Sequence, residues 1–258
     1  MTTLTALRHG ETLTSGHSRP CIVEGETSDG KRHEVVLKLR EDVHGKANGL
    51  ACEWVASQIA SAVGLNVPPP FLVEVTAEFA ESVPDAAARA RYHANLGRHF
   101  GSLLVGPQTH ALPYDFTLPP DLVDPATAVI AFDALLGNDD RHLKKSNYLI
   151  QGSRVVLIDH ERAFPSARHE IRAGPWEPSG LDFIQNHIFL PGVRGALPDW
   201  PAVRASWTGV TPHKLTGICR SIPPEWNGDG VAQRVETYLL AMHPQAPKAL
   251  DLLEAMLR

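Results

Sequence analysis

The sequence predicts an α+β fold of two lobes: a small β-rich N-terminal lobe with one main helix, and a larger, mainly helical C-terminal lobe. Residues 1–76 contain alternating extended segments and a single helical pattern. From Thr76 onward, helical patterns and loops with scattered Pro and Gly replace the strands. We therefore expect a boundary near residues 74–80, with residues 1–76 in the first lobe and residues 77–258 in the second.

A hairpin is expected early in the N-terminal lobe. Residues 20–26 and 34–39 are rich in strand-forming residues, and the segment between them contains Asp29 and Gly30. An Asp-Gly pair between two such runs is a strong hairpin signal, because Gly adopts the left-handed conformation that a tight turn requires.

One helix and one further strand complete this lobe. Residues 50–63 place large apolar side chains along one helical face, and Gly64 stands where a left-handed residue often ends a helix. Three prolines at 68–70 then force an extended path into the apolar strand at residues 71–75.

The C-terminal lobe is predicted from helical patterns. Residues 85–104 look helical, and a second helix starts at Asp124 and runs to Gly137. The chain then looks irregular from Asp159 to about residue 211, before two final helices at residues 231–241 and 247–257.

Composition excludes several classes of protein. Residues of both charge signs are interspersed, and the net charge of −5 argues against nucleic acid as a direct partner. No apolar run is long enough to cross a membrane, and we expect no membrane partner. The three cysteines, Cys21, Cys52 and Cys219, have no metal or redox spacing, which favours reduced thiols and a cytoplasmic protein.

The polar segment at residues 137–150 carries the clearest chemical signal. It contains Asp140 and Asn147, and twelve residues after Asn147 an apolar run at 155–158 leads to Asp159. Transfer of phosphate from ATP needs a carboxylate to orient and deprotonate a hydroxyl, and an Asn and a second carboxylate to hold Mg²⁺. A hairpin would bring its two ends to within about 5 Å. We therefore predict Asp140 as the base and Asn147 and Asp159 as metal ligands; each could instead be an ordinary cap or turn residue.

Lys38 and Glu53 form a second candidate pair. Lys38 interrupts an apolar strand and alternation places it opposite Val35 and Leu37, so it either reaches solvent from a sheet edge or points into a cleft. Glu53 lies in the middle of the predicted helix without charged neighbours. In kinases, a helix glutamate holds a strand lysine so that its ammonium meets the α- and β-phosphates of ATP.

Nucleotide contacts are also expected from a small-residue turn before the first clear strand. Backbone N–H groups at Gly16, His17 and Ser18 can cradle phosphate there, although an ordinary surface turn has the same composition. We include Glu74, in the strand that leads to the predicted boundary, among the expected nucleotide contacts.

With these residues in view, the chain resembles the HipA-like kinases. The features that carry the resemblance are the turn at residues 15–20, the strand at 35–39, the helix at 53–56 followed by 64–68, and the motifs at 137–142 and 157–160. The resemblance implies a bilobal protein-kinase-like fold, ATP with Mg²⁺, and phosphorylation of serine or threonine on a protein. It assigns the nucleotide lysine to Lys38, its partner to Glu53, the base to Asp140 and the metal ligands to Asn147 and Asp159. In related toxins an antitoxin partner keeps the kinase in check, so the resemblance also implies an antitoxin-like regulatory protein as a possible partner.

Two departures from the usual kinase pattern leave alternatives open. The metal-binding Asn usually falls five residues after the base, but that position is Lys145 here and Asn147 falls seven after Asp140. A rival register makes His142 the base, and the adjacent Asp139 is a further competitor. Asp159 is followed by a His-Glu pair instead of Phe-Gly.

Three functions from different classes remain open beside a protein kinase. The Lys145 spacing is consistent with a pseudokinase that binds nucleotide without turnover. A kinase-like fold could also act on a lipid or small-molecule alcohol, or transfer AMP. Self-modification at Ser15 or Ser18 is a further hypothesis.

Overall fold

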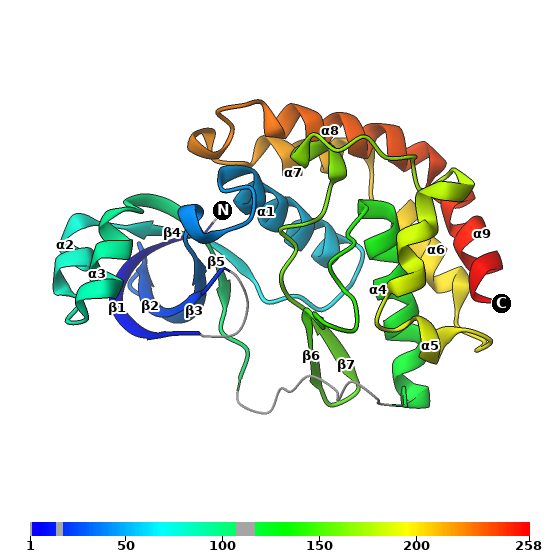
Figure 1. The fold of residues 1–258 in the computed structure, drawn as a ribbon, viewed down its shortest axis with the longest axis horizontal. Coiled ribbons are helices and arrows are strands. Elements are labelled where there is room, and N and C mark those ends of the chain that lie inside the picture. The colour runs from blue at the N-terminus through cyan, green and yellow to red at the C-terminus, as the bar shows by residue number, and fades with distance from the viewer. Residues whose placement is uncertain (1, 14–17, 107–116) are drawn as a thin grey trace.

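The computed structural model describes residues 2–13, 18–106 and 117–258 and has a mixed α+β fold (Figure 1). Five strands close into a barrel in the N-terminal part of the chain, and two later strands form a separate hairpin. The barrel strands are β1 (Thr3–Thr12), β2 (Cys21–Thr27), β3 (Arg32–Lys38), β4 (Pro70–Val75) and β5 (Gly97–Leu103). The hairpin strands are β6 (Tyr148–Gln151) and β7 (Arg154–Leu157).

Helices make up most of the chain beyond the barrel. The α-helices are α1 (Ala47–Ala62), α2 (Ala77–Ser82), α3 (Ala86–His93), α4 (Val123–Leu136), α5 (Leu190–Val193), α6 (Trp200–Thr208), α7 (Pro212–Arg220), α8 (Val231–Met242) and α9 (Ala246–Leu257). Short 3₁₀ turns are η1 (Arg40–Asp42), η2 (Pro120–Leu122), η3 (Pro165–Arg168), η4 (Pro178–Asn186), η5 (Pro224–Trp226) and η6 (His243–Gln245). In the described part of the chain, no helix combines the length and apolar character needed to cross a bilayer.

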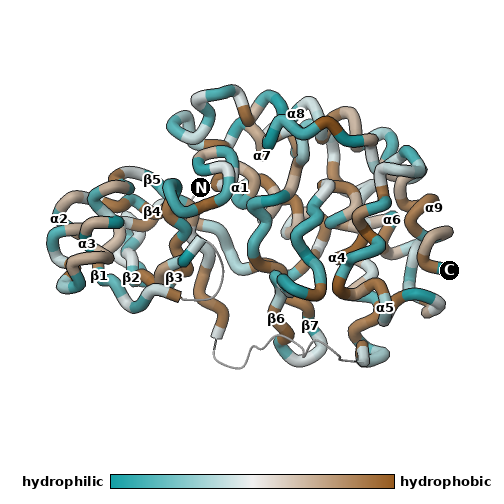
Figure 2. Tube along the Cα trace, in the orientation of Figure 1, coloured by the Kyte–Doolittle hydropathy of each residue, from teal (hydrophilic) through white to brown (hydrophobic). Residues whose placement is uncertain are grey.

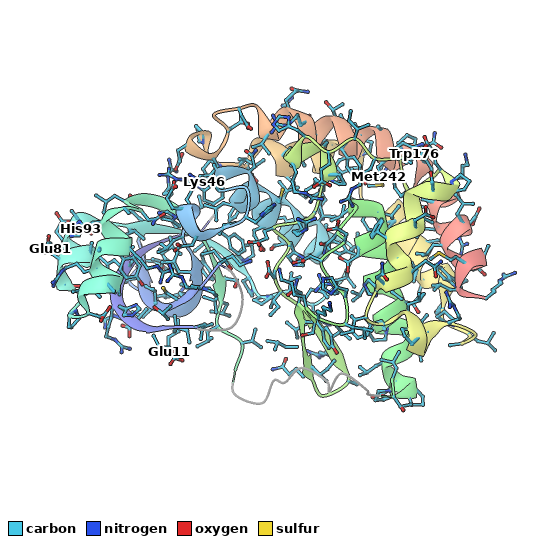
Figure 3. All side chains as sticks on the ribbon, viewed as in Figure 1. Glu11, Lys46, Glu81, His93, Trp176 and Met242 are labelled. Atoms are coloured by element: carbon cyan, nitrogen blue, oxygen red, sulfur yellow. The ribbon has the colours of Figure 1, made fainter. Side chains whose placement is uncertain are left out.

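The barrel has the strand order β1-β2-β3-β5-β4 and closes by parallel pairing of β1 with β4. Alternate residues of each strand point inward, as Val35 and Leu37 do on β3, and form one apolar core. Helices α2 and α3 cover the end of the barrel away from the other helices (Figure 1) and add Phe79 and Tyr92 to this core. On their outer surface, Nε2 of His93 lies 2.9 Å from Oε1 of Glu81 (Figure 3).

The prediction of a helix through residues 85–104 is wrong in its second half. Helix α3 ends at His93, and Gly97–Leu103 is the strand β5, which pairs with both β3 and β4. Gly97 has a φ of 100°, which a helix cannot contain. A Cβ on Gly101 would lie 2.5 Å from Val73 Cγ2, so the barrel wall requires glycine there. The barrel thus takes its fifth strand from beyond the boundary predicted near residues 74–80.

His99 on β5 makes barrel stability depend on pH. Its Nδ1 accepts a hydrogen bond from the Arg40 backbone N–H at 3.0 Å, and Nε2 donates to the Asn95 carbonyl at 2.7 Å, so the ring is neutral. Burial lowers the pKa of His99 to about 4, against 6.5 for the unfolded chain. A lowered pKa gives a contribution that is complete above pH 6.5 and is lost as the pH falls toward 4.

Acidification from pH 7.5 to pH 5 should therefore lower the free energy of unfolding less in His99→Gln than in wild type. We expect the difference to be about 2 kcal/mol. Urea unfolding at both pH values would measure it, with the exposed His213→Gln on α7 as the matched control. An unchanged pH dependence in the His99 variant would contradict the assignment.

The second apolar core lies among the helices and reaches the outer face of the barrel at Leu72 and Phe100. The helix predicted at residues 50–63 is present as α1, which ends at Ala62, but it is buried on nearly all sides because it lies between the barrel and helices α7 and α8. Helix α4 is also almost wholly buried. Figure 2 shows apolar residues in brown where these elements pack, whereas the loops above the β6–β7 hairpin are largely hydrophilic.

Several local predictions are confirmed. Gly30 and Gly64 are left-handed, with φ values of 80° and 81°, and α4 ends at the left-handed Gly137. The irregular stretch predicted up to residue 211 is wrong in two parts, because α5 and α6 lie within it. Asp199 starts α6 by accepting a hydrogen bond from the Ala202 backbone N–H at 2.9 Å.

Candidate active site

Strand β3 and helix α1 bring Lys38 and Glu53 together. Val35 and Leu37 are buried in the barrel, so alternation places Lys38 on the outer face of β3. Its Nζ donates to Oε1 of Glu53, which is buried on α1. The same Nζ donates to Oδ1 of Asp159 at 2.8 Å. The predicted contact between Lys38 and Glu53 is therefore confirmed, and the acid that follows β7 joins it.

The β6–β7 hairpin sets the positions of Asn147 and Asp159. Asn147 precedes β6 and Asp159 follows β7 closely, and the pairing of Tyr148 with Leu157 brings the two ends together. Both residues have positive φ, 47° and 59°. Non-glycine residues in this region are held there by surrounding contacts and cluster at functional sites. The hairpin predicted from residues 147–159 is present.

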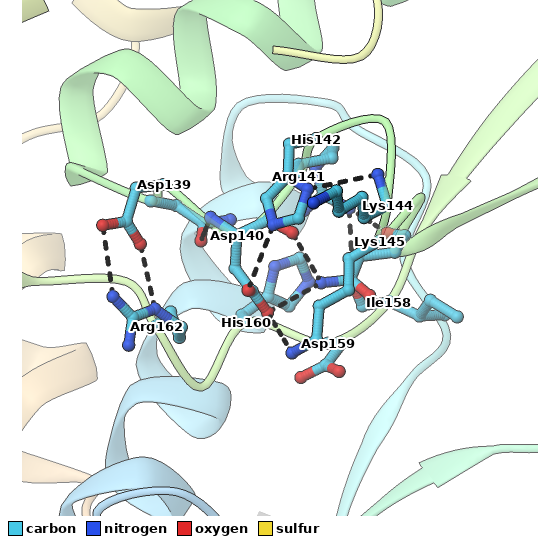
Figure 4. Close-up of polar contacts among 12 residues, drawn as sticks. Asp139, Asp140, Arg141, His142, Lys144, Lys145, Ile158, Asp159, His160 and Arg162 are labelled. Atoms are coloured by element: carbon cyan, nitrogen blue, oxygen red, sulfur yellow. Dashed lines mark hydrogen bonds and ion pairs between the residues drawn. The ribbon is translucent and has the colours of Figure 1, made fainter. Parts of the chain in front are cut away.

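Asp140 lies in the polar loop between α4 and β6 (Figure 4) and is hydrogen-bonded to Asn147. The Nδ2 of Asn147 donates to Oδ2 of Asp140 and to its backbone carbonyl, each at 3.1 Å. Lys145 Nζ lies 2.9 Å from the same Oδ2. The loop and the hairpin therefore form one polar cluster, with the Asn147 amide as its link.

A buried acid on α4 anchors this loop. Oδ2 of Asp133 accepts from Nε of Arg141 at 2.6 Å and lies 3.0 Å from Nε2 of His187, and its Oδ1 accepts from Nδ2 of Asn138 at 2.7 Å. Burial acts to raise the pKa of Asp133, but the charge of Arg141 and the His187 hydrogen bond outweigh it and lower the pKa to about 2. Arg141 also donates to the backbone carbonyl of Asn147.

Sequence reasoning missed this anchor. One signal was present, because Asp133 is the only acid of α4 beyond its first turn and lies among mostly apolar residues. A buried carboxylate needs a paired cation or hydrogen bonds. The partners, however, lie in two different segments, Asn138 and Arg141 in the loop after α4 and His187 beyond η4, and nothing in their spacing identifies them.

The two competing bases have different surroundings from Asp140. Asp139 is held by Arg162 at 2.9 Å and by Arg172 at 2.6 Å. Burial acts to raise the pKa of Asp139, but these hydrogen bonds lower it to about 2, which makes it a poor proton acceptor. Nε2 of His142 lies 4.0 Å from Oδ1 of Asp140, so both remain within reach of one substrate position.

Electrostatics around Lys38 favour its charged form. Burial acts to lower the pKa of Lys38, but the charges of Asp159 and Glu53 raise it above its ordinary value. Burial likewise acts to raise the pKa of Asp159, and the charge and hydrogen bond of Lys38 hold it below the usual range. Burial raises the pKa of Glu53 despite the opposing charge of Lys38. Lys38 and Asp159 thus form an ion pair at neutral pH.

Oxygen ligands suitable for a metal ion gather beside this pair. Carboxylate oxygens of Glu53, Asp159 and Glu161 all lie within 4.8 Å of one another. Such a set fits a hard cation such as Mg²⁺, which prefers oxygen ligands. A cavity of about 320 Å³ opens next to it, lined by His44, Asp139, Asp140, His142, Lys145, Glu161 and Arg162.

Of the remaining predicted nucleotide contacts, Ser18 and Glu74 lie in the described part of the chain. Gly16 and His17 lie outside the described residues. Ser18 is described and is buried. Glu74 lies on β4, and among the described residues its side chain makes no hydrogen bond or ion pair with Lys38 or Asp159.

Comparisons with known proteins agree with this architecture. A solved structure, the crystal structure of the Helicobacter pylori proinflammatory kinase CtkA, is similar with a TM-score of 0.54 and 11% sequence identity, over 92% of this chain and 95% of that one. Its low identity means that it supports the fold alone. The open conformation of CtTel1 matches with a TM-score of 0.35 and 12% identity, over 95% of this chain and 11% of that one, too weakly to carry an argument. No protein of a curated collection matches.

A family model gives the more specific result. The model that describes the HipA-like kinases matches residues 11–245, which include the barrel from β2 onward, the polar loop and the hairpin. This match extends over most of the chain and agrees with the resemblance seen in the motifs around Lys38, Asp140 and Asp159. The chain belongs to the HipA-like kinase family.

Proposed function

We propose that this chain is an ATP- and Mg²⁺-dependent phosphotransferase that transfers the γ-phosphate to a serine or threonine hydroxyl of a protein. The observation that carries the proposal is the position of Lys38, whose Nζ contacts both Glu53 on α1 and Asp159 after β7. That contact joins the barrel to the polar cluster around Asp140, as a kinase site requires.

Each residue then has a defined task. Glu53 holds the Lys38 ammonium, which binds the α- and β-phosphates, and Asn147 and Asp159 hold Mg²⁺, which neutralises phosphate charge. Asp140 accepts the proton of the attacking hydroxyl. The hydroxyl oxygen forms a bond to the γ-phosphorus, the bond to the β–γ bridging oxygen breaks, and ADP leaves.

The two-lobed arrangement is part of this proposal. Because β5 belongs to the barrel, we place the end of the N-terminal lobe after Leu103 instead of at residue 76. A protein substrate, an antitoxin-like regulatory partner and a cytoplasmic location also remain proposals. Family membership supports the first two, and the free thiols of Cys21, Cys52 and Cys219 are consistent with the third.

Parallel incubations with α- and γ-labelled ATP and Mg²⁺ would test the function, with the protein itself and a generic basic protein as acceptors. We expect label on protein from the γ position only. Lys38→Met should abolish it, whereas Lys31→Met, at an exposed lysine in the turn before the same strand, should not. Retention of the α label would instead indicate AMP transfer.

A second candidate, a nucleotide-binding module without turnover, is favoured by one contact. Lys145 Nζ pairs with Asp140 Oδ2 and so occupies the oxygen that would accept the proton. Equal, background-level labelling by wild type and Asp140→Asn, with retained nucleotide binding, would favour this candidate over the kinase.

A further inference from the structure

Glu161 is a buried acid whose carboxylate is left incompletely paired. It lies two residues after Asp159 and is 4% exposed. Its Oε2 is shielded from solvent and has no hydrogen-bond partner among the described residues. Burying a carboxylate oxygen in this way is costly unless a cation or a proton compensates it. The surroundings of Glu161 therefore have to supply one of the two.

Its neighbours increase the excess of negative charge. Oxygens of Glu53 and Asp159 lie within 4.8 Å of a Glu161 oxygen. Lys38 is hydrogen-bonded to both of those residues, and the backbone N–H of His160 donates to Glu53 at 2.8 Å. Three carboxylates thus share one ammonium, and Glu161 is the member that Lys38 does not bind.

The other nearby lysine already forms an ion pair with a different acid. Lys145 is paired with Asp140 at 2.9 Å. Glu161 nevertheless lines the cavity that contains Asp140 and Lys145, so an ion could reach it from that side. A divalent cation would balance the charge that Lys38 leaves uncompensated, and carboxylate oxygens are ligands that Mg²⁺ prefers.

We propose that Glu161 is an additional Mg²⁺ ligand of this site, acting with Asp159 and Asn147. The proposal rests on the proposed function, because it concerns the ion that the nucleotide brings. It also explains a departure in the sequence: the second residue after Asp159 is an acid here instead of the usual glycine. That position supplies an oxygen ligand in this chain.

The competing explanation is that Glu161 is simply protonated. A neutral carboxylic acid would tolerate burial, and Glu161→Gln would then mimic it closely. If Glu161 is ionised and has no cation bound in the metal-free protein, the same substitution removes a repulsive charge. The first case predicts little change in metal binding or in the stability of the metal-free protein, whereas the second predicts a change in both.

Binding of Mn²⁺, as a paramagnetic substitute for Mg²⁺, would be measured by electron paramagnetic resonance in the presence of a non-hydrolysable ATP analogue. We expect Glu161→Gln and Glu161→Ala to weaken Mn²⁺ binding about tenfold or more. Glu177→Gln, at an exposed glutamate in the same part of the chain, serves as the matched control and should bind as wild type does. Equal affinity in wild type and both Glu161 variants would overturn the proposal.

Thermal unfolding provides a second readout that does not need nucleotide. In EDTA, Glu161→Gln should melt above wild type because the crowded carboxylates repel each other less. Added Mg²⁺ should raise the melting temperature of wild type more than that of the variant. If Glu161→Gln and wild type had the same melting temperature in EDTA and again in Mg²⁺, Glu161 would be protonated and would not be a ligand.

These outcomes separate the inference from the proposed function. If wild type binds neither Mn²⁺ nor the ATP analogue, the phosphotransferase proposal itself fails. If wild type binds both, Asp159→Asn loses metal binding, and Glu161→Gln retains it, then only the role of Glu161 is refuted.

Discussion

Asp140→Asn is expected to reduce γ-phosphate transfer by about 10²–10⁴-fold, the usual contribution of a positioned general base. The fold should survive, because Asn keeps the shape of the side chain and can still accept a hydrogen bond from the Asn147 amide. Nucleotide binding should also remain, since Lys38 and Asp159 are unchanged. Single-turnover labelling with γ-labelled ATP, alongside circular dichroism, would measure both.

Two further variants identify the base. Asp139→Asn should lose less activity than Asp140→Asn, because Asp139 is bound by Arg162 and Arg172 and does not accept the proton. His142→Gln tests the rival register. If His142→Gln lost as much activity as expected for Asp140→Asn, and Asp140→Asn lost little, the base would be His142 and the assignment of Asp140 would be wrong.

Local patterns in the sequence predicted the parts of the site that depend on neighbouring residues. Alternation along β3 is sufficient to direct Lys38 away from Val35 and Leu37, and a strand pair is sufficient to bring Asn147 close to Asp159. Both follow from strand geometry over fewer than about fifteen residues. The contact between Lys38 and Glu53 needed only one additional assumption, that the helix packs against the outer face of the strand.

Features that depend on distant segments were not predictable in this way. β5 was taken for a helix because its strand character comes from pairing with β3 and β4, and the tight fit at Gly101 is a property of the closed barrel. The position of Glu161 beside Glu53 likewise depends on α1 lying next to the segment that follows β7, where the backbone N–H of His160 donates to Glu53. A single sequence contains no signal for such contacts.

Lys145 shows how structure refines a sequence anomaly. Its place five residues after Asp140 was the main argument against activity, since Asn is usual there. The loop is two residues longer than usual, and Asn147 still reaches Asp140 with its amide. The unusual spacing therefore adds a cation to the cluster and does not remove the Asn.

The largest effect on stability is expected from Asp133. Removing its carboxylate in Asp133→Ala leaves the guanidinium of Arg141 buried without its ion-pair partner, and loss of one member of a buried pair typically costs about 3–5 kcal/mol. Urea unfolding at pH 7.5 would measure this loss. Asp121→Asn, an exposed acid at the turn before the same helix, is the matched control and should change stability by less than about 0.5 kcal/mol.

The same network also has a defined pH response. Because the folded pKa of Asp133 is about 2 and the unfolded value is 3.8, its stabilisation is complete above pH 4 and is lost only as the pH falls toward 2. The deficit of Asp133→Ala should therefore stay constant from pH 7.5 to pH 5. A deficit that vanished by pH 5 would show that Asp133 is not held ionised by Arg141. Since Arg141 also binds the Asn147 carbonyl, Asp133→Ala should lower phosphate transfer even under conditions where the variant is fully folded.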